Sequence, residues 1–146
     1  MTKLRPINQI FDDPFGVLKS WNHSQHHCHW EGVACSTQHQ RVMALTLRDK
    51  LLSGPISPVV GNLSFIRFIQ LRENQFHGEV PQEFGRLFRL RVLNLSNNAF
   101  GGKILVNLSH CLEIINISLH HNKLEGKIPI DQLSSFKKLK RLVRLV

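Results

Sequence analysis

Apolar side chains recur along this chain at a fixed interval of 24 residues, starting at Val42. In every copy an aliphatic residue is followed by two more, three and five positions later, so that alternate side chains of a short strand face inward. These residues are Val42, Leu45, Leu47; Ile66, Ile69, Leu71; Leu90, Leu93, Leu95; and Ile114, Ile117, Leu119. The agreement among copies predicts a solenoid, in which each copy buries its apolar face against the next.

Polar and glycine positions keep the same interval. An asparagine lies eight positions after the first aliphatic residue, and a glycine lies four positions after that. We expect the asparagine amides to turn inward and bond backbone groups that the bend leaves unpaired. We expect the glycines to mark a turn with positive φ or a close backbone approach. The asparagines are Asn74, Asn98 and Asn122, with Lys50 in the first copy, and the glycines are Gly54, Gly78, Gly102 and Gly126.

The interval also divides the chain into segments. A solenoid needs a cap over its first open face, and the residues before Val42 are assigned to it. The fourth copy is one residue longer than the others, because Leu139 restarts the pattern after 25 positions. The predicted division is an irregular N-terminus (1–10), a cap (11–41), four repeats (42–65, 66–89, 90–113 and 114–138) and an incomplete, basic fifth repeat (139–146).

The repeat L-x-x-L-x-L-x-x-N-x-L-x-G-x-I-P resembles the plant-specific leucine-rich repeat, and the segments FDDPFGVLKSWN and CHWEGVAC resemble the N-terminal cap of that family. The resemblance implies an α/β-type repeat solenoid, wound as a right-handed superhelix with an N-terminal cap. It also implies a disulfide between Cys28 and Cys35. We expect no C-terminal cap, because the pattern fails after Leu142. A short amphipathic helix in the cap is expected from Phe11, Phe15, Val17, Leu18 and Trp21.

The residues around the cap cysteines by themselves leave three interpretations open: a disulfide, a zinc site or two free thiols, with the redox compartment as the arbiter. Zinc is considered because histidines crowd this segment, although C-x6-C is not the usual zinc spacing. The histidines are His23, His26, His27, His29 and His39. Cys111 occupies an apolar column of the repeat, which predicts a buried, inert thiol and not a catalytic one. We expect no metal and no cofactor.

Five asparagines stand in N-x-[ST] sequons, which are acceptors for N-glycosylation in the secretory pathway. The same letters also belong to the repeat, so the sequons have a structural interpretation as well. Asn62 and Asn107 are expected on the convex side or an edge and are the better acceptors, whereas Asn94 and Asn116 lie on strands. The full set is Asn22, Asn62, Asn94, Asn107 and Asn116.

The outward residues of the strands form the concave face, which solenoids commonly use for binding. Arginines make this face basic in its N-terminal half, and Phe68 supplies an aromatic anchor. The alternative is a solvated strand face without a ligand. The candidate binding residues are Arg48, Arg67, Phe68, Gln70, Arg72, Arg91, Asn94 and His120.

Composition narrows the function classes. The chain of 146 residues has a formal charge of +9 and 42% hydrophobic residues, which permits one packed domain. No apolar run is long enough for a membrane span or a secretory signal. The C-terminal basic run is interpreted as solvated, because no nucleic-acid-binding signature accompanies it. None of the common hydrolase, phosphate-loop or kinase motifs occurs.

Residues 11–138 resemble the N-terminal ectodomain of plant leucine-rich-repeat receptor-like kinases, most of all the immune-receptor type, through GNLSFIRFIQL and RLFRLRVLNLSNN. The resemblance implies recognition of a protein or peptide ligand, with a co-receptor, at the extracellular face of the plasma membrane in defence or development signalling. The kinase domain of that family is absent from this chain, so no enzymatic activity is expected. The alternatives are a secreted leucine-rich-repeat binding protein or inhibitor, and a truncated product without function.

Overall fold

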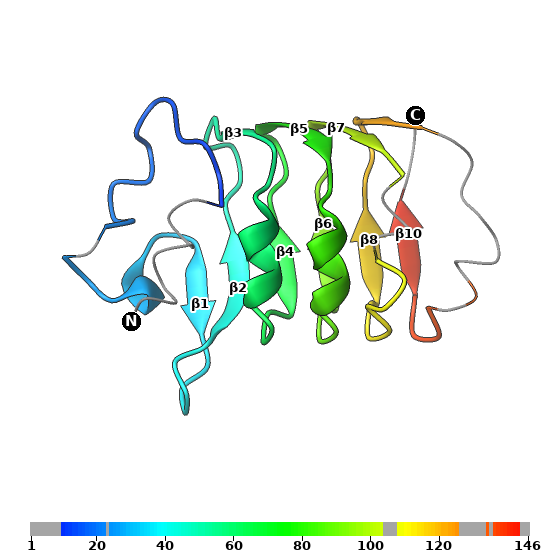
Figure 1. Cartoon of the computed structure of the whole chain (residues 1–146), viewed down its shortest axis with the longest axis horizontal. Coiled ribbons are helices and arrows are strands. Elements are labelled where there is room, and N and C mark those ends of the chain that lie inside the picture. The colour runs from blue at the N-terminus through cyan, green and yellow to red at the C-terminus, as the bar shows by residue number, and fades with distance from the viewer. Residues whose placement is uncertain (1–9, 23, 104–107, 126–133, 135, 144–146) are drawn as a thin grey trace.

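Each repeat begins with a short strand, and these strands pair side by side along the molecule. In the computed structural model, the described residues are 10–22, 24–103, 108–125, 134 and 136–143. Within them the inner sheet has the order β1-β2-β4-β6-β8-β10 (Figure 1). Its strands are β1 (Val33–Cys35), β2 (Val42–Thr46), β4 (Phe68–Gln70), β6 (Val92–Asn94), β8 (Asn116–Ser118) and β10 (Arg141–Val143). The strands from β2 onward are parallel, and β1 runs antiparallel to β2.

The register of the inner sheet places one inward residue of each strand in a continuous row. Leu45, Ile69, Leu93 and Ile117 are paired in order and are fully buried. Leu142 continues the row opposite Ile117, 25 positions further along the chain, so the longer fourth repeat does not disturb the register. The predicted spacing of the strands is thereby confirmed, while the outer limits assigned to each repeat stay a prediction.

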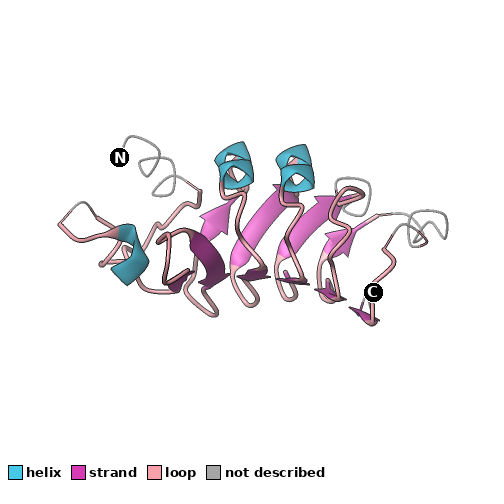
Figure 2. Cartoon of the chain, turned by 90° about the horizontal axis from the view of Figure 1, so that it is seen from below, coloured by secondary structure: helices cyan, strands magenta, loops and turns pink. Residues whose placement is uncertain are grey.

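A second sheet runs through the four repeats, and short 3-10 helices complete the turns of the first two. The second sheet has the order β3-β5-β7-β9 within the described residues. It lies along the upper edge in Figure 1, and Figure 2 shows the helices of the first two repeats on the side opposite the inner sheet. The remaining elements are β3 (Ser53–Gly54), β5 (Gln75–Glu79), β7 (Ala99–Gly102), β9 (Lys123–Leu124), η2 (His27–His29), η3 (Pro58–Asn62) and η4 (Gln82–Arg86).

Asparagines tie neighbouring repeats together, as the sequence predicts. The Nδ2 group of Asn98 donates to the backbone oxygens of Leu71 (3.0 Å), Leu95 (3.1 Å) and Ser96 (3.1 Å), and its Oδ1 accepts from the Phe76 amide at 3.1 Å. One side chain therefore satisfies groups of its own repeat and of the preceding one. Asn74 and Asn122 bond in the same pattern.

The predicted turn glycines have the expected backbone conformation where the structure describes them. Gly54, Gly78 and Gly102 have φ of +78°, +78° and +74°. A second column of positive φ, which the sequence did not predict, follows β2, β4, β6 and β8 without glycine. Its residues are Asp49 (φ 55°), Glu73 (φ 60°), Asn97 (φ 57°) and His121 (φ 59°). Gly126 lies outside the described residues.

Aromatic rings extend the core from the cap into the repeats. Phe11 lies 5.3 Å from Phe76, and Phe76 lies 5.9 Å from Phe100, measured between ring centroids. All three residues are buried. Cys111 is also fully buried, and its thiol donates to the Phe84 carbonyl oxygen at 3.2 Å. Burial raises the pKa of the Cys111 thiol to about 12, so this cysteine is an inert core residue as predicted.

The prediction of an amphipathic helix in the cap is wrong. Within the described part of the chain, residues 11–21 contain two turns and an isolated bridge from Asp12 to Ser53, and no helix. The Asp13 carboxylate accepts hydrogen bonds from the amides of Val17 and Leu18, each at 2.9 Å. A side chain that bonds nearby backbone amides competes with helix formation. Leu18 is buried, whereas Phe15 has 66% of its surface exposed and does not serve as a core anchor.

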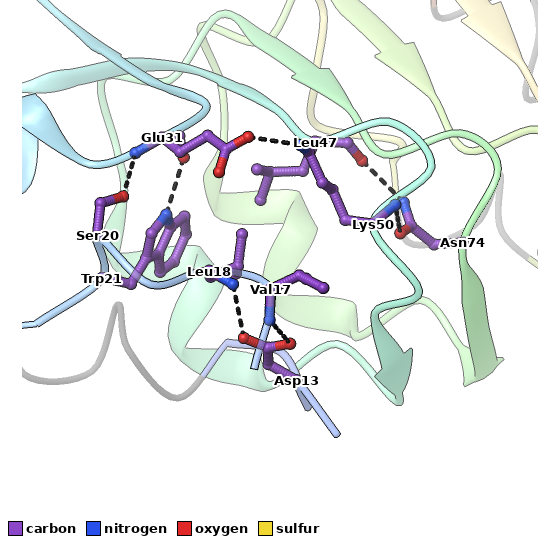
Figure 3. A network of polar contacts seen from close by, with 9 residues as sticks. All are labelled: Asp13, Val17, Leu18, Ser20, Trp21, Glu31, Leu47, Lys50 and Asn74. Atoms are coloured by element: carbon purple, nitrogen blue, oxygen red, sulfur yellow. Dashed lines mark hydrogen bonds and ion pairs between the residues drawn. The ribbon is translucent and has the colours of Figure 1, made fainter. Parts of the chain in front are cut away.

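The cap is joined to the first repeat through Glu31 (Figure 3). The Glu31 amide donates to the Ser20 hydroxyl at 2.8 Å, and its carbonyl oxygen accepts from Trp21 Nε1 at 2.8 Å. Its carboxylate pairs with Lys50 Nζ at 2.5 Å. Lys50 stands at the asparagine column of the first repeat, and its own amide donates to Asn74 Oδ1 at 3.0 Å. The lysine therefore replaces the repeat asparagine with a link to the cap.

Candidate functional site

The concave face is made by the outward side chains of the inner strands, which form two rows across the sheet. The first row contains an apolar centre, because Phe68 is paired with Ala44 on one side and Val92 on the other. Asn116 and Arg141 continue this row. From β2 to β8 the second row is polar and contains Thr46, Gln70, Asn94 and Ser118. A ligand on this face therefore meets an apolar row next to a hydrogen-bonding row.

The predicted arginines differ in whether a carboxylate neutralises their charge. Arg48 pairs with Glu73 at 3.1 Å, so its charge is partly compensated. Among the described residues, no carboxylate lies within ion-pair distance of Arg67, Arg72 or Arg91. Arg67 and Arg91 come directly before the strands that carry Phe68 and Val92. These two arginines and Phe68 are brought to one end of the concave face.

Two other predicted residues are engaged with neighbours. Asn94 Oδ1 accepts from the amide of Ser96 at 3.1 Å and from its hydroxyl at 2.7 Å. The Nδ1 atoms of His120 and His121 lie 2.8 Å apart, so one ring donates a hydrogen bond to the other. Gln70 lies between Thr46 and Asn94 in the polar row.

The sequons lie in different surroundings. Asn62 ends η3 and is exposed, whereas Asn94 and Asn116 are half-buried on inner strands. The amide of Asn22 is exposed but engaged, because Nδ2 donates to the Lys19 carbonyl at 2.8 Å and Oδ1 accepts from the Ser24 amide at 2.8 Å. Asn107 lies outside the described residues. Asn62 is exposed and its side chain forms no hydrogen bond within the described residues, and its glycosylation stays a prediction.

Cys28 and Cys35 form a disulfide with a Cα–Cα distance of 5.6 Å, as the family resemblance implied. The zinc and free-thiol interpretations of this pair are therefore wrong, since zinc binds the thiolate form of cysteine. His26, His27 and Cys28 still group together, with His27 Nε2 at 3.5 Å from Cys28 Sγ. His23 lies outside the described residues.

The buried histidine of the cap has a perturbed pKa. Burial of His27 lowers its pKa from the ordinary value of 6.5, and the nearby His26 lowers it further. Its Nδ1 atom is buried without a hydrogen-bond partner among the described residues. The neutral form of His27 is thus the one that suits the folded cap.

One arrangement was not anticipated from the sequence. Arg41 and Arg89 both stack on Phe65, with their Cζ atoms 4.2 and 4.1 Å from the ring centroid. These residues lie in the turns that precede β2, β4 and β6, one repeat apart. The equivalent position of successive repeats holds different residue types, so the sequence pattern does not indicate that Arg41, Phe65 and Arg89 are in contact. The pairing register of the inner strands brings them together.

Comparison with known proteins matches both parts of this architecture. A family profile described as "Leucine rich repeat N-terminal domain" matches residues 4–36, and one described as "Leucine Rich Repeat" matches residues 89–111. The LRR receptor-like serine/threonine-protein kinase EFR of Arabidopsis thaliana is 51% identical over 55 residues, which is 38% of this chain and 5% of that protein. The chain thus spans a small part of the length of this relative.

Solved structures are similar over nearly the whole chain. The BIR2 ectodomain of Arabidopsis thaliana is 34% identical with a TM-score of 0.85, and the similarity covers 95% of this chain and 75% of that one. The ectodomain of the plant membrane receptor kinase GASSHO1/SCHENGEN3 from the same plant, in complex with CASPARIAN STRIP INTEGRITY FACTOR 2, is 29% identical with a TM-score of 0.90. It covers 99% of this chain and 18% of that one. Both similarities lie in the ectodomain.

Among the described residues, no helix has the length and apolar character needed to cross a membrane.

Proposed function

This chain belongs to the plant leucine-rich-repeat receptor ectodomains, and on that premise we propose that its concave face recognises a peptide or protein ligand. The observation that carries the proposal is the apolar row centred on Phe68, next to the uncompensated charges of Arg67 and Arg91. Aromatic residues and arginines together are typical of the sites that dominate binding energy at protein interfaces. The solved complex of the similar GASSHO1/SCHENGEN3 ectodomain supports a ligand of this class.

The size of the face favours a short segment. Strands about 4.8 Å apart give the five parallel strands a width of roughly 20 Å, which matches about six residues of an extended peptide. A standard protein interface buries about 800 Å² on each partner, which is larger than this face offers. A peptide, or the exposed loop of a larger protein, therefore fits better than a flat protein surface. A co-receptor would contact the ligand-bound chain outside this face.

The cap disulfide supports a place in an oxidising compartment, because such bonds persist mainly in secreted and extracellular proteins. Together with the family, it is the reason to propose the extracellular face of the plasma membrane as the site of action. Signalling in defence or development, with a kinase as the output, is part of the same proposal. The matched regions of relatives lie in the repeats and the cap, so the role assigned to this chain is binding and not catalysis.

The proposal is tested by selecting a displayed library of random 12-residue peptides on the secreted, disulfide-bonded chain. Enriched peptides are then measured against Phe68→Ser and the double variant Arg67→Gln/Arg91→Gln. The matched control is Arg86→Gln, an exposed arginine of η4 on the opposite side of the solenoid. We expect at least a tenfold loss of affinity in the two concave variants and less than a twofold change in the control. Enriched peptides that bind Phe68→Ser as well as the wild type would refute the assignment of the face.

A further inference from the structure

The turns that precede the inner strands line one long edge of the solenoid, the lower edge in Figure 1. We call this the turn edge and define it as residues 40–43, 64–67, 88–91, 112–115 and 137–141. Cations dominate it: Arg41, Arg67, Arg89, Arg91, Lys137, Lys138, Lys140 and Arg141. Its one carboxylate, Glu113, pairs with Lys138 at 2.9 Å. The edge is thus a strip of positive charge that adjoins the concave face and shares Arg67, Arg91 and Arg141 with it. Arg41 and Arg89 belong to the edge alone.

Stacking holds two of these cations in place. Arg41 ends the cap and Arg89 ends the second repeat, and the Cζ atoms of both lie about 4 Å from the Phe65 ring centroid. They therefore lie within about twice that distance of each other. Arg89 also lies 5.1 Å from the Phe88 ring. A cation over an aromatic face is attracted to the ring and loses conformational freedom before any ligand arrives.

The stacked arginines keep their hydrogen-bonding capacity. A guanidinium group carries five N–H donors, and a contact with a ring face leaves donors available to bind a carboxylate bidentately. Within the part of the chain that the structure describes, neither guanidinium forms a hydrogen bond or an ion pair. Two fixed, unpaired and closely spaced donors are the arrangement that recognises a pair of anionic groups.

Exposed apolar side chains continue the strip. Phe88 and Leu112 occupy the same column of neighbouring repeats and have 52% and 51% of their surfaces exposed. Apolar side chains side by side on a surface favour contact with an apolar group of a partner. A polypeptide can offer carboxylates and an apolar side chain at fixed spacing, whereas a nucleic-acid backbone offers only sugars and phosphates.

We propose that the turn edge is a docking site for an acidic segment of another protein, bound in an extended conformation. Carboxylates two residues apart in a strand lie on the same side and about 7 Å apart. This spacing lies within the upper limit that the Phe65 contacts set for the separation of Arg41 and Arg89. The next side chain on that side reaches Phe88 and Leu112 if it is apolar. The segment has the form acidic, any, acidic, any, apolar, and it runs along the solenoid from the cap toward the later repeats.

The test uses the full chain and a fluorescein-labelled peptide of sequence Gly-Glu-Ser-Glu-Ser-Phe-Gly, followed by fluorescence anisotropy. Arg41→Gln/Arg89→Gln is compared with Arg86→Gln/Lys103→Gln, which removes the same charge at exposed residues outside the edge. We expect at least a tenfold loss of affinity for the edge variant and less than a twofold change for the control. Arg41→Lys/Arg89→Lys, which keeps the charge without the planar group, is expected to lose at least threefold.

Thermal unfolding of every variant distinguishes a loss of binding from a loss of folding. A further control is Phe68→Ser, which should bind the probe as tightly as the wild type, because Phe68 is not part of the turn edge. Equal losses in the edge and control variants would show that affinity follows net charge alone and would overturn the proposal. Equal binding of the Gln-for-Glu peptide would overturn it too. So would a single-stranded oligo-dT that binds more tightly than the peptide and depends on the same two arginines.

Discussion

At the scale of single residues, the side chains with the most demanding hydrogen-bonding roles in this molecule are the inward asparagines of the repeats. Asn98 serves four backbone groups drawn from two repeats, so its side chain replaces a stretch of regular hydrogen bonding at the bend. An aliphatic residue of similar size would fill the space and leave those groups unpaired. Burying unpaired backbone groups costs more than the hydrogen bonds themselves contribute.

Replacing Asn98 with Ala should lower the free energy of unfolding by about 2–3 kcal/mol, because several half-buried backbone groups lose their partner. Urea unfolding followed by circular dichroism measures the change. Asn97→Gly is the matched control, since Asn97 is exposed and its positive φ of 57° suits glycine. An Asn98→Ala loss no larger than that of the control would contradict the role assigned to the ladder.

His27 should make the cap sensitive to acid. Its pKa is lowered in the folded state by burial and by His26, so the unfolded chain takes up the proton more readily. The stability from neutral His27 is therefore complete above the ordinary pKa of 6.5 and is lost as the pH falls below it. Unfolding free energies measured at several values between about pH 8 and pH 5 should fall more steeply for the wild type than for His27→Gln. His29→Gln, at an exposed position, should keep the wild-type slope.

At the scale of elements, the repeats could be predicted from the sequence because the same apolar spacing occurs in every copy. The inner strands, the buried row through Leu45 and Ile69, and the inward asparagines all follow from it. The cap sequence has no repeated spacing from which its structure could be predicted. A helix is predicted there, but the Asp13 carboxylate instead accepts hydrogen bonds from the amides of Val17 and Leu18. Local hydrogen bonding by a short acidic side chain decided the outcome there.

The candidate sites show the same division. The concave face could be predicted, because alternation along a strand assigns each side chain to one face. The turn edge could not, since its column holds Arg41, Phe65, Arg89 and Glu113, which share no property along the sequence. Their contacts arise only when parallel pairing brings residues 24 positions apart next to each other.

The cap disulfide should stabilise this element by about 2–3 kcal/mol, the value for a short closed loop in the chain-entropy account. Cys28→Ser/Cys35→Ser should lower the unfolding free energy by that amount. Adding a reductant should destabilise the wild type to a similar degree and leave the double variant unchanged. A wild-type melting temperature that is the same with and without reductant would show that the bond contributes nothing.

At the scale of the whole molecule, stability and binding chemistry follow the stacking of repeats. Each inner strand pairs with the strands of the adjacent repeats, and the asparagine bonds also reach no further than one repeat. Such a solenoid behaves as a chain of nearest-neighbour contacts. The surfaces do not follow this nearest-neighbour rule. The charge and the apolar side chains of the concave face and of the turn edge come from several repeats together.

The antiparallel strand β1 has a consequence for how this architecture can change length. It fixes the start of the inner sheet, so every later repeat occupies a position set by the number of repeats between it and the cap. Duplicating one whole repeat would move all later ones by about 4.8 Å and keep the register of their strands. One additional residue in a repeat does not change the strand pairing, since Leu142 still pairs with Ile117 across a separation of 25. The distance between two surface features can therefore change only in steps of one strand spacing.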